Sequence, residues 1–124
     1  MNLAIVTDPT KEQIADFHQG LDDYNSQFVA NEFIPVRAVV TDDADQVIAG
    51  IDCIAHWGKL HVDILWVHSD HRRKGLGRRL MAWAEEQARA MDSRSVVVNT
   101  MSFQAPGFYP KLGYTQFGQI ENYE

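Results

Sequence analysis

The sequence predicts a mixed α/β fold (α+β), in which one sheet contains both antiparallel and parallel strands and is flanked by helices. Two observations support this class. Three extended apolar segments, 36–40, 46–56 and 60–67, are separated only by short turns, which is typical of an antiparallel meander. A helical segment then separates the third strand from a strand at 95–100, and this order implies a parallel crossover.

The N-terminal part is predicted to begin with a short strand at 3–6. Thr10 has the pattern of a helix N-cap, and Gln13 completes a capping box. Apolar residues then follow at helical spacing up to Leu21. The segment 22–35 leaves two interpretations open, a second short helix or an ordered loop.

The third strand, 60–67, alternates in character, which predicts two faces. One face would hold Val62, Ile64 and Trp66, and the other His61, Asp63 and Leu65.

After this strand, apolar residues recur at helical period from Gly75 to Met91. Residues 101–113 hold a short helix at most, and 114–120 read as a last strand. The sheet would therefore contain about six strands.

Bulk properties restrict the class of protein. The 124 residues are predicted to form one domain, 1–124. The net charge of -6 argues against nucleic-acid binding, which depends on neutralising many phosphates. No apolar window approaches the ~20 residues of a membrane span. Cys53 is the only cysteine and reads as a small buried hydrophobe, so a soluble cytoplasmic protein without disulfides is predicted.

A cluster of cations stands out against this acidic background. Five of the eleven basic residues fall in eight positions: Arg72, Arg73, Lys74, Arg78 and Arg79.

The cluster surrounds two glycines at the predicted start of a helix, Gly75 and Gly77. The first turn of a helix offers unpaired N–H groups and a partial positive charge, and glycine lets a phosphate approach the backbone. Cations there oppose the helix dipole unless an anion is present, so a site for a diphosphate-sized anion is predicted. The alternative is a basic helix start that is merely solvated. Neither a P-loop nor a dinucleotide fingerprint fits, because Leu80 stands where the latter needs a third glycine.

The string that fits is R-x-x-G-x-G, residues 72–77, and here the chain resembles the GNAT superfamily of N-acetyltransferases. LWVHSDHRRKGLGRRLMAWAEEQAR is similar to the coenzyme motif of that family, and NTMSFQAPGFYPKLGY to its following strand and FY-x-K-x-GY segment. The resemblance implies a sheet opened like a V between strands 60–67 and 95–100. It also implies acetyl-CoA as co-substrate and no metal.

The resemblance implies that the coenzyme contacts lie along these two motifs. The expected contact residues are Leu65, Trp66, Val67, Arg72, Arg73, Lys74, Gly75, Leu76, Gly77, Arg78, Asn99 and Phe103.

The implied reaction moves an acetyl group from acetyl-CoA to a primary amine of a small molecule or peptide, by direct attack in a ternary complex. Tyr109 matches the tyrosine of the family segment and is the candidate acid, because a phenol can donate a proton to a thiolate of comparable basicity. The alternative is a core aromatic beside Phe108. Asp63 is the first candidate for the base and His61 the second, and a structural role for either stays open.

The amine-binding side is expected to come from the segment before the first long strand. Tyr24, Asn25 and Phe28 are the candidate substrate-binding residues. The resemblance includes one more strand after 114–120, so the sheet edge is open to three outcomes: a bare edge, cover by a partner subunit, or a swapped segment. A homodimer is therefore one candidate state. The rival interpretation is a non-catalytic module that binds or senses acyl-CoA.

Overall fold

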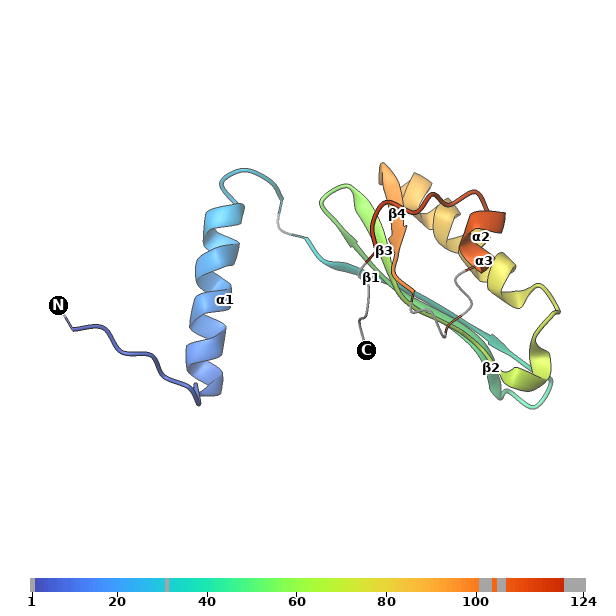
Figure 1. Cartoon of the computed structure of the whole chain (residues 1–124), viewed down its shortest axis with the longest axis horizontal. Coiled ribbons are helices and arrows are strands. Elements are labelled where there is room, and N and C mark those ends of the chain that lie inside the picture. The colour runs from blue at the N-terminus through green and yellow to red at the C-terminus, as the bar shows by residue number, and fades with distance from the viewer. Residues whose placement is uncertain (1, 31, 101–103, 105–106, 120–124) are drawn as a thin grey trace.

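The computed structural model of the chain describes residues 2–30, 32–100, 104 and 107–119 (Figure 1). Its elements are α1 (Lys11–Asn25), β1 (Ile34–Thr41), β2 (Val47–His56), β3 (Lys59–Val67), the 3-10 turn η1 (Ser69–His71), α2 (Leu76–Ala90), β4 (Ser95–Val98) and α3 (Phe108–Lys111).

The strands form one mixed sheet in the order β1-β2-β3-β4. The first three strands are antiparallel neighbours, and β4 runs parallel to β3 after the α2 crossover. The predicted fold class is therefore confirmed. The β2–β3 hairpin turns at Trp57 and Gly58, whose φ angles are 52° and 79°. Two successive left-handed residues match the twist of a hairpin, which explains why so short a turn suffices.

The core lies between α2 and one face of the sheet (Figure 1). Alternate residues of β2 point to this face, and α2 contributes its apolar positions at helical spacing. The buried side chains are Val36, Ala49, Ile51, Cys53, Ala55, Leu60, Val62, Leu76, Leu80, Met81, Ala84 and Ala88.

The N-terminal helix forms as predicted but stands away from the sheet (Figure 1). The backbone N–H of Gln13 donates to Thr10 Oγ1 at 3.1 Å, and Gln13 Oε1 accepts from the N–H of Thr10 at 2.9 Å, so the capping box is confirmed. No described residue of α1 is buried. The segment 26–30 forms turns and loop rather than a second helix.

The strand predicted at 3–6 is wrong. Residues 2–10 hold no strand in the structure, and Leu3 and Ile5 are 87% and 93% exposed. Four apolar residues become a strand only where another strand pairs with them, and this segment lies beyond the sheet (Figure 1).

The last predicted strand, 114–120, is also absent among its described residues, 114–119. Its first residue is tied instead to the helix layer, because Tyr114 Oη donates to Glu85 Oε2 at 2.8 Å. The described sheet therefore contains four strands rather than about six.

The predicted faces of β3 are wrong beyond Val62, because the register with β2 shifts between Asp52 and Cys53. Val62 pairs with Cys53 and Ile64 with Asp52, so Asp63 is the extra residue of a β-bulge. The bulge moves Ile64 to the face opposite the core, where it is 57% exposed. A bulge has no signature in apolar alternation, so the pattern alone could not reveal it.

Candidate active site

The sheet opens into a cleft where β3 and β4 separate. Their parallel pairing ends at Val62 and Val98, although β3 continues to Val67. This confirms the predicted V-shaped opening. The cleft measures about 640 Å³. Its lining consists of Val62, Asp63, Ile64, Leu65, Trp66, Val67, His71, Arg72, Arg73, Gly75, Leu76, Gly77, Arg78, Val98, Asn99, Thr100, Gln104, Phe108 and Tyr109.

The start of α2 forms one wall of the cleft. Gly75 is the N-cap, with φ 76°, a left-handed conformation that glycine adopts without strain. Glycine has no side chain that could cap the helix. The N–H groups of the first turn of α2 therefore remain available to a ligand. Gly77 lies against Phe108, whose Cζ would be 3.3 Å from an added Cβ. Glycine at this position therefore keeps the helix close to α3.

The basic cluster surrounds this helix start. Arg72, Arg73 and Arg78 line the cleft and are exposed, and Lys74 beside them lies outside the lining. Lys74 Nζ is 3.1 Å from His71 Nδ1. Among the described residues, no ion pair to a carboxylate involves these cations, so their charge is not neutralised within this part of the chain.

Tyr109 enters the cleft from α3. Its ring packs edge-on against Phe108 at 5.1 Å and against Tyr114 at 6.1 Å between ring centroids. Burial raises the pKa of Tyr109 above its ordinary value, so the phenol stays protonated at neutral pH. Tyr109 therefore packs beside Phe108, as the core-aromatic alternative expects, and it also lines the cleft, where the candidate acid is expected.

The two base candidates form a pair. His61 Nδ1 lies 2.6 Å from Asp63 Oδ1, and the two side chains are 35% and 38% exposed. Asp63, the residue of the bulge, lines the cleft, whereas His61 is not part of this lining.

Other predicted residues fall in three groups. Asn99 lies within the predicted strand 95–100, but β4 ends at Val98, so Asn99 follows the strand; it is exposed and lines the cleft. Phe103 lies outside the described residues. Tyr24, Asn25 and Phe28 lie on or just after α1 and do not line the cleft within this chain.

Sequence reasoning gave no coenzyme or catalytic role to several lining residues, among them His71 and Thr100. His71 adjoins the basic cluster, and this neighbourhood is the signal that could have identified it.

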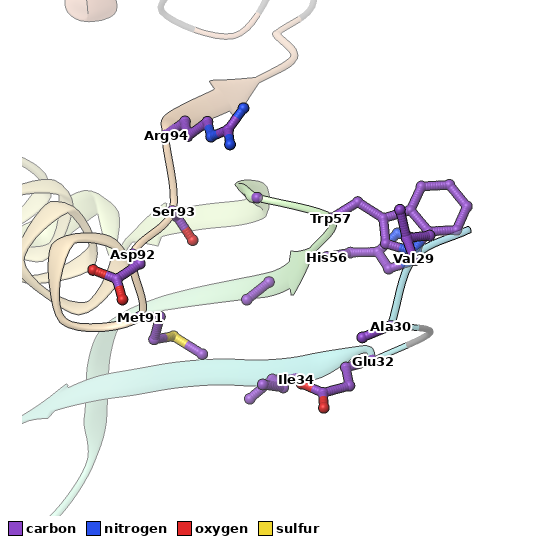
Figure 2. A pocket seen from close by; sticks show the side chains of 12 residues that line it. Val29, Ala30, Glu32, Ile34, His56, Trp57, Met91, Asp92, Ser93 and Arg94 are labelled. Carbon is purple, nitrogen blue, oxygen red and sulfur yellow. The ribbon is translucent and has the colours of Figure 1, made fainter. Parts of the chain in front are cut away.

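A second hollow lies at the far end of the sheet, shares no lining residue with the cleft and measures about 530 Å³ (Figure 2). It lies between the loop after α2 and the linker from α1 to β1. His56 forms part of it, between the rings of Phe33 and Trp57, with centroid distances of 3.7 and 3.9 Å.

Three further findings concern metal binding, membrane-spanning helices and the cysteine. Within the described ranges, no group of His, Cys, Asp and Glu side chains is placed to hold a metal ion. No described helix has both the length and the apolar character needed to cross a bilayer. Cys53 is fully buried, and burial raises the pKa of its thiol to about 11, which opposes formation of a nucleophilic thiolate.

Comparison with known proteins gives a consistent result. The family model of the acetyltransferase (GNAT) domain matches residues 35–116, more than half of the chain. Blasticidin-S acetyltransferase of Streptomyces morookaense is 42% identical over 79 residues, which cover 63% of this chain and 58% of that protein. The aligned part is thus less than two thirds of that relative's length.

Solved structures share the fold. An acetyltransferase from Bacillus cereus superimposes with a TM-score of 0.88 at 26% identity, covering 96% of this chain and 88% of that one. A protein assigned as a streptothricin acetyltransferase from Bacillus anthracis, in complex with acetyl coenzyme A, gives a TM-score of 0.59 at 21% identity, covering 71% of this chain and 51% of that one.

Proposed function

Because the chain belongs to the GNAT acetyltransferase family, we propose that it transfers an acetyl group from acetyl-CoA to a primary amine of a small molecule or peptide, by direct attack in a ternary complex. The observation that carries this proposal is the cleft between β3 and β4, because an uncapped helix start and a cluster of cations open into it.

The diphosphate of acetyl-CoA is expected at the first turn of α2. Amides of this turn point out of the helix end, and the dipole favours an anion there. The guanidinium groups of Arg72, Arg73 and Arg78 lie around the same opening and supply full charges. Lys74 is expected to add charge from the rim.

The pantetheine part of acetyl-CoA is expected along β3. Past Val62 the edge of β3 that faces β4 has no partner strand, so the backbone of Leu65, Trp66 and Val67 is left open toward the cleft. Unpaired backbone groups are strong hydrogen-bonding sites for an extended amide chain. Asn99, just after the end of β4, lines the same cleft and would donate or accept a further bond.

Tyr109 is proposed as the general acid. Bound acetyl-CoA supplies a thioester, and its sulfur leaves as a thiolate that needs a proton. The phenol of Tyr109 is protonated because burial raises its pKa, and it lines the cleft near the start of α2. Donation by a positioned acid contributes typically about 10²–10⁴-fold to a rate.

The Asp63–His61 pair is proposed to take the proton that the amine loses. Asp63 lines the cleft and contacts His61 at 2.6 Å, so a proton accepted by one group is shared with the other. Because both side chains are part-exposed, the proton can then pass to solvent.

Coenzyme binding is tested first by thermal shift, with acetyl-CoA, coenzyme A, ATP and NAD as ligands. Acetyl-CoA and coenzyme A share a 3'-phosphorylated ADP, and we expect only these two to raise the Tm strongly. If neither raises the Tm, or if all four act alike, the coenzyme assignment is wrong.

Turnover is tested by release of free thiol from acetyl-CoA in the presence of amines. The panel includes blasticidin S, an aminoglycoside and a lysine peptide, because one relative is a blasticidin-S acetyltransferase. We expect Tyr109→Phe to lower kcat by about 100-fold or more while coenzyme affinity is retained.

The matched control is Tyr114→Phe. The ring of Tyr114 packs against that of Tyr109, but its phenol donates to Glu85 and does not line the cleft. Removal of this hydroxyl should therefore leave kcat unchanged. Equal turnover of Tyr109→Phe and wild type would remove the acid role from Tyr109. Binding of acetyl-CoA without release of thiol for any amine would favour a sensing module over an enzyme.

A further inference from the structure

The arm, defined as the described residues 2–30, carries an apolar stripe that nothing in the described chain covers. Its helix, α1, buries no residue. The stripe runs at helical spacing along one side of α1 and into the following turn. It consists of Ile14, Phe17, Leu21, Tyr24 and Phe28, which are 37%, 62%, 60%, 59% and 69% exposed.

The sheet has a matching uncovered surface. Its open face, defined as the face opposite α2, carries no helix in the described part of the chain (Figure 1). Val39 pairs with Gly50, which pairs with Trp66, so these three form one row across the sheet. Val39 and Trp66 are 62% and 43% exposed, and Ile64 beside them is 57% exposed. Gly50, which lies between Val39 and Trp66 in this row, has no side chain.

Neither apolar surface is covered by another part of the described chain. An isolated helix of about 15 residues is marginal in water, and its stability in proteins comes from packing of its apolar face. A sheet likewise needs its apolar face covered. The same chain thus exposes an apolar helix side with no sheet against it and a sheet face with no helix on it.

The direction in which the arm leaves is set by contacts. Phe33 stacks on His56, whose ring lies against that of Trp57. Val29 and Trp57 line the same hollow (Figure 2). These contacts hold the linker at the end of the sheet, and α1 continues away from it (Figure 1). An arm held in this way is directed outward, away from the open face of its own chain.

The Bacillus cereus acetyltransferase shares this placement. Residues 34–124 are about three quarters of the 124, so their superposition alone could not give a TM-score of 0.88 over 96% of the chain. The arm therefore contributes to the superposition, and its position relative to the sheet is common to both proteins.

From these observations we propose that two copies of this chain exchange arms, so that α1 of each copy lies on the open face of the other. In a symmetric exchange each chain contributes both its stripe and its open face, so the same apolar contact is made twice. Ile64 and Trp66 belong both to the open face and to the lining of the cleft. The exchanged arm would thus form a wall of the partner's cleft, and neither site is complete in one chain.

A lipid surface is a poorer occupant for the stripe. Membrane-surface helices have a polar face rich in Lys and Arg. The charged positions of α1 are mostly acidic instead, with Lys11 against Glu12, Asp16, Asp22 and Asp23. A second copy offers an apolar surface for the stripe, since every copy that carries a stripe also carries an open face.

The proposal is independent of catalysis and is tested by the molar mass in solution, measured by light scattering on a sizing column. Wild type is expected at twice the mass of one chain. Phe17→Glu should convert it to the single-chain mass. Ala15→Glu is the matched control, because it places the same charge on the other side of α1 and should leave the dimer intact.

A second variant changes the open face of the sheet instead of the arm. An added Cβ at Gly50 would lie 3.5 Å from Ala38 O and 3.7 Å from Val39 Cγ1, which are ordinary contacts. Gly50→Glu should therefore keep the fold, checked by circular dichroism and Tm, while it places a charge in the middle of the open face. We expect it to give the single-chain mass as well. A single-chain mass for wild type, or a dimer that survives both variants, would overturn the proposal.

Arm exchange is separated from other dimers by cross-linking. One chain carries Phe17→Cys and Val39→Cys, with Cys53→Ala to remove the native thiol, and is treated with a short bismaleimide. Exchange predicts a covalent dimer on a denaturing gel, and the pair Ala15→Cys and Val39→Cys should give far less. A cross-linked single chain would show that the arm folds onto its own sheet, and an absence of cross-links would show that the arm docks elsewhere. Either result would overturn the proposal.

Discussion

Two regions of the molecule are stabilised differently: the packed half, which is the sheet with α2 around the cleft, and the N-terminal arm. All the described buried apolar residues lie between Val36 and Ala88, whereas α1 has none. The helix α2 combines a helical pattern with a core of its own to pack on. The helix α1 has only its pattern and its capping box. The contrast teaches that local signals can specify a helix without specifying where it packs, and four predictions probe this difference.

The largest expected effect is on the packed half. Met81 is 1% exposed and belongs to the buried side of α2, within the core. Met81→Ala should lower the free energy of unfolding by about 3 kcal/mol, because it leaves a cavity. Urea denaturation measures this change. Leu3→Ala is the counterpart in the arm, where 87% exposure predicts less than about 0.5 kcal/mol. Equal losses of unfolding free energy for Met81→Ala and Leu3→Ala would contradict the difference between the packed half and the arm.

The second prediction concerns alkaline pH. The pKa of the buried Cys53 thiol is raised from 9.0 to about 11, first by burial and then by Asp52 and Asp63. Because the folded pKa is the higher one, this contribution to stability is complete below pH 9 and is lost as the pH rises through 11, up to about 3 kcal/mol.

The variant Cys53→Ala isolates this contribution. At pH 8 it should be less stable than wild type by about 1 kcal/mol, because it loses packing. Between pH 9 and 11 the difference should close or reverse, since the variant has no thiol to ionise. Urea midpoints measured across this range give the answer. A difference that stays constant with pH would show that the thiol does not titrate in the folded chain in this way.

The third prediction compares two left-handed glycines at opposite ends of the sheet. Gly75 has φ 76° and Gly58 has φ 79°, and an added Cβ at either would meet nothing within 4 Å among the described atoms. Alanine at each should therefore cost about 1–2 kcal/mol of backbone strain, seen as similar losses of Tm.

Only Gly75→Ala should also weaken acetyl-CoA binding, by about tenfold (~1.4 kcal/mol), because its Cβ stands at the expected diphosphate site. Isothermal titration measures the affinity. Similar losses of affinity for both variants would indicate that strain, rather than contact, governs binding.

The sequence predicted the packed half well because its signals are local. The basic cluster, the glycines of the helix start and the following crossover all occur within about thirty consecutive residues, and the structure places most of the predicted coenzyme residues around one cleft. The roles of these residues remain predictions.

Three errors have a common physical cause, namely that the deciding partner is distant in the sequence. The segments 3–6 and 114–119 have strand-like composition, yet neither pairs with another described strand. The faces of β3 depended on a bulge at Asp63, which only the register with β2 reveals. The substrate-binding role expected for Tyr24, Asn25 and Phe28 is not one of these errors and stays a prediction, because it depends on where α1 packs.

The smallest expected effect tests how the two chain ends differ. The segment after α3 is tied to α2 by Tyr114 Oη, which donates to Glu85 Oε2 at 2.8 Å, whereas described residues before Lys11 have no such bond to the core. Tyr114→Phe should lower the free energy of unfolding by about 1 kcal/mol. Burial and the bond to Glu85 raise the pKa of Tyr114, so the phenol stays protonated and the loss should be the same at pH 7 and pH 9. Chemical denaturation at both pH values measures it. A loss that disappears at pH 9 would show that the phenol ionises there, and no loss at either pH would leave the C-terminal segment as loosely attached as the arm.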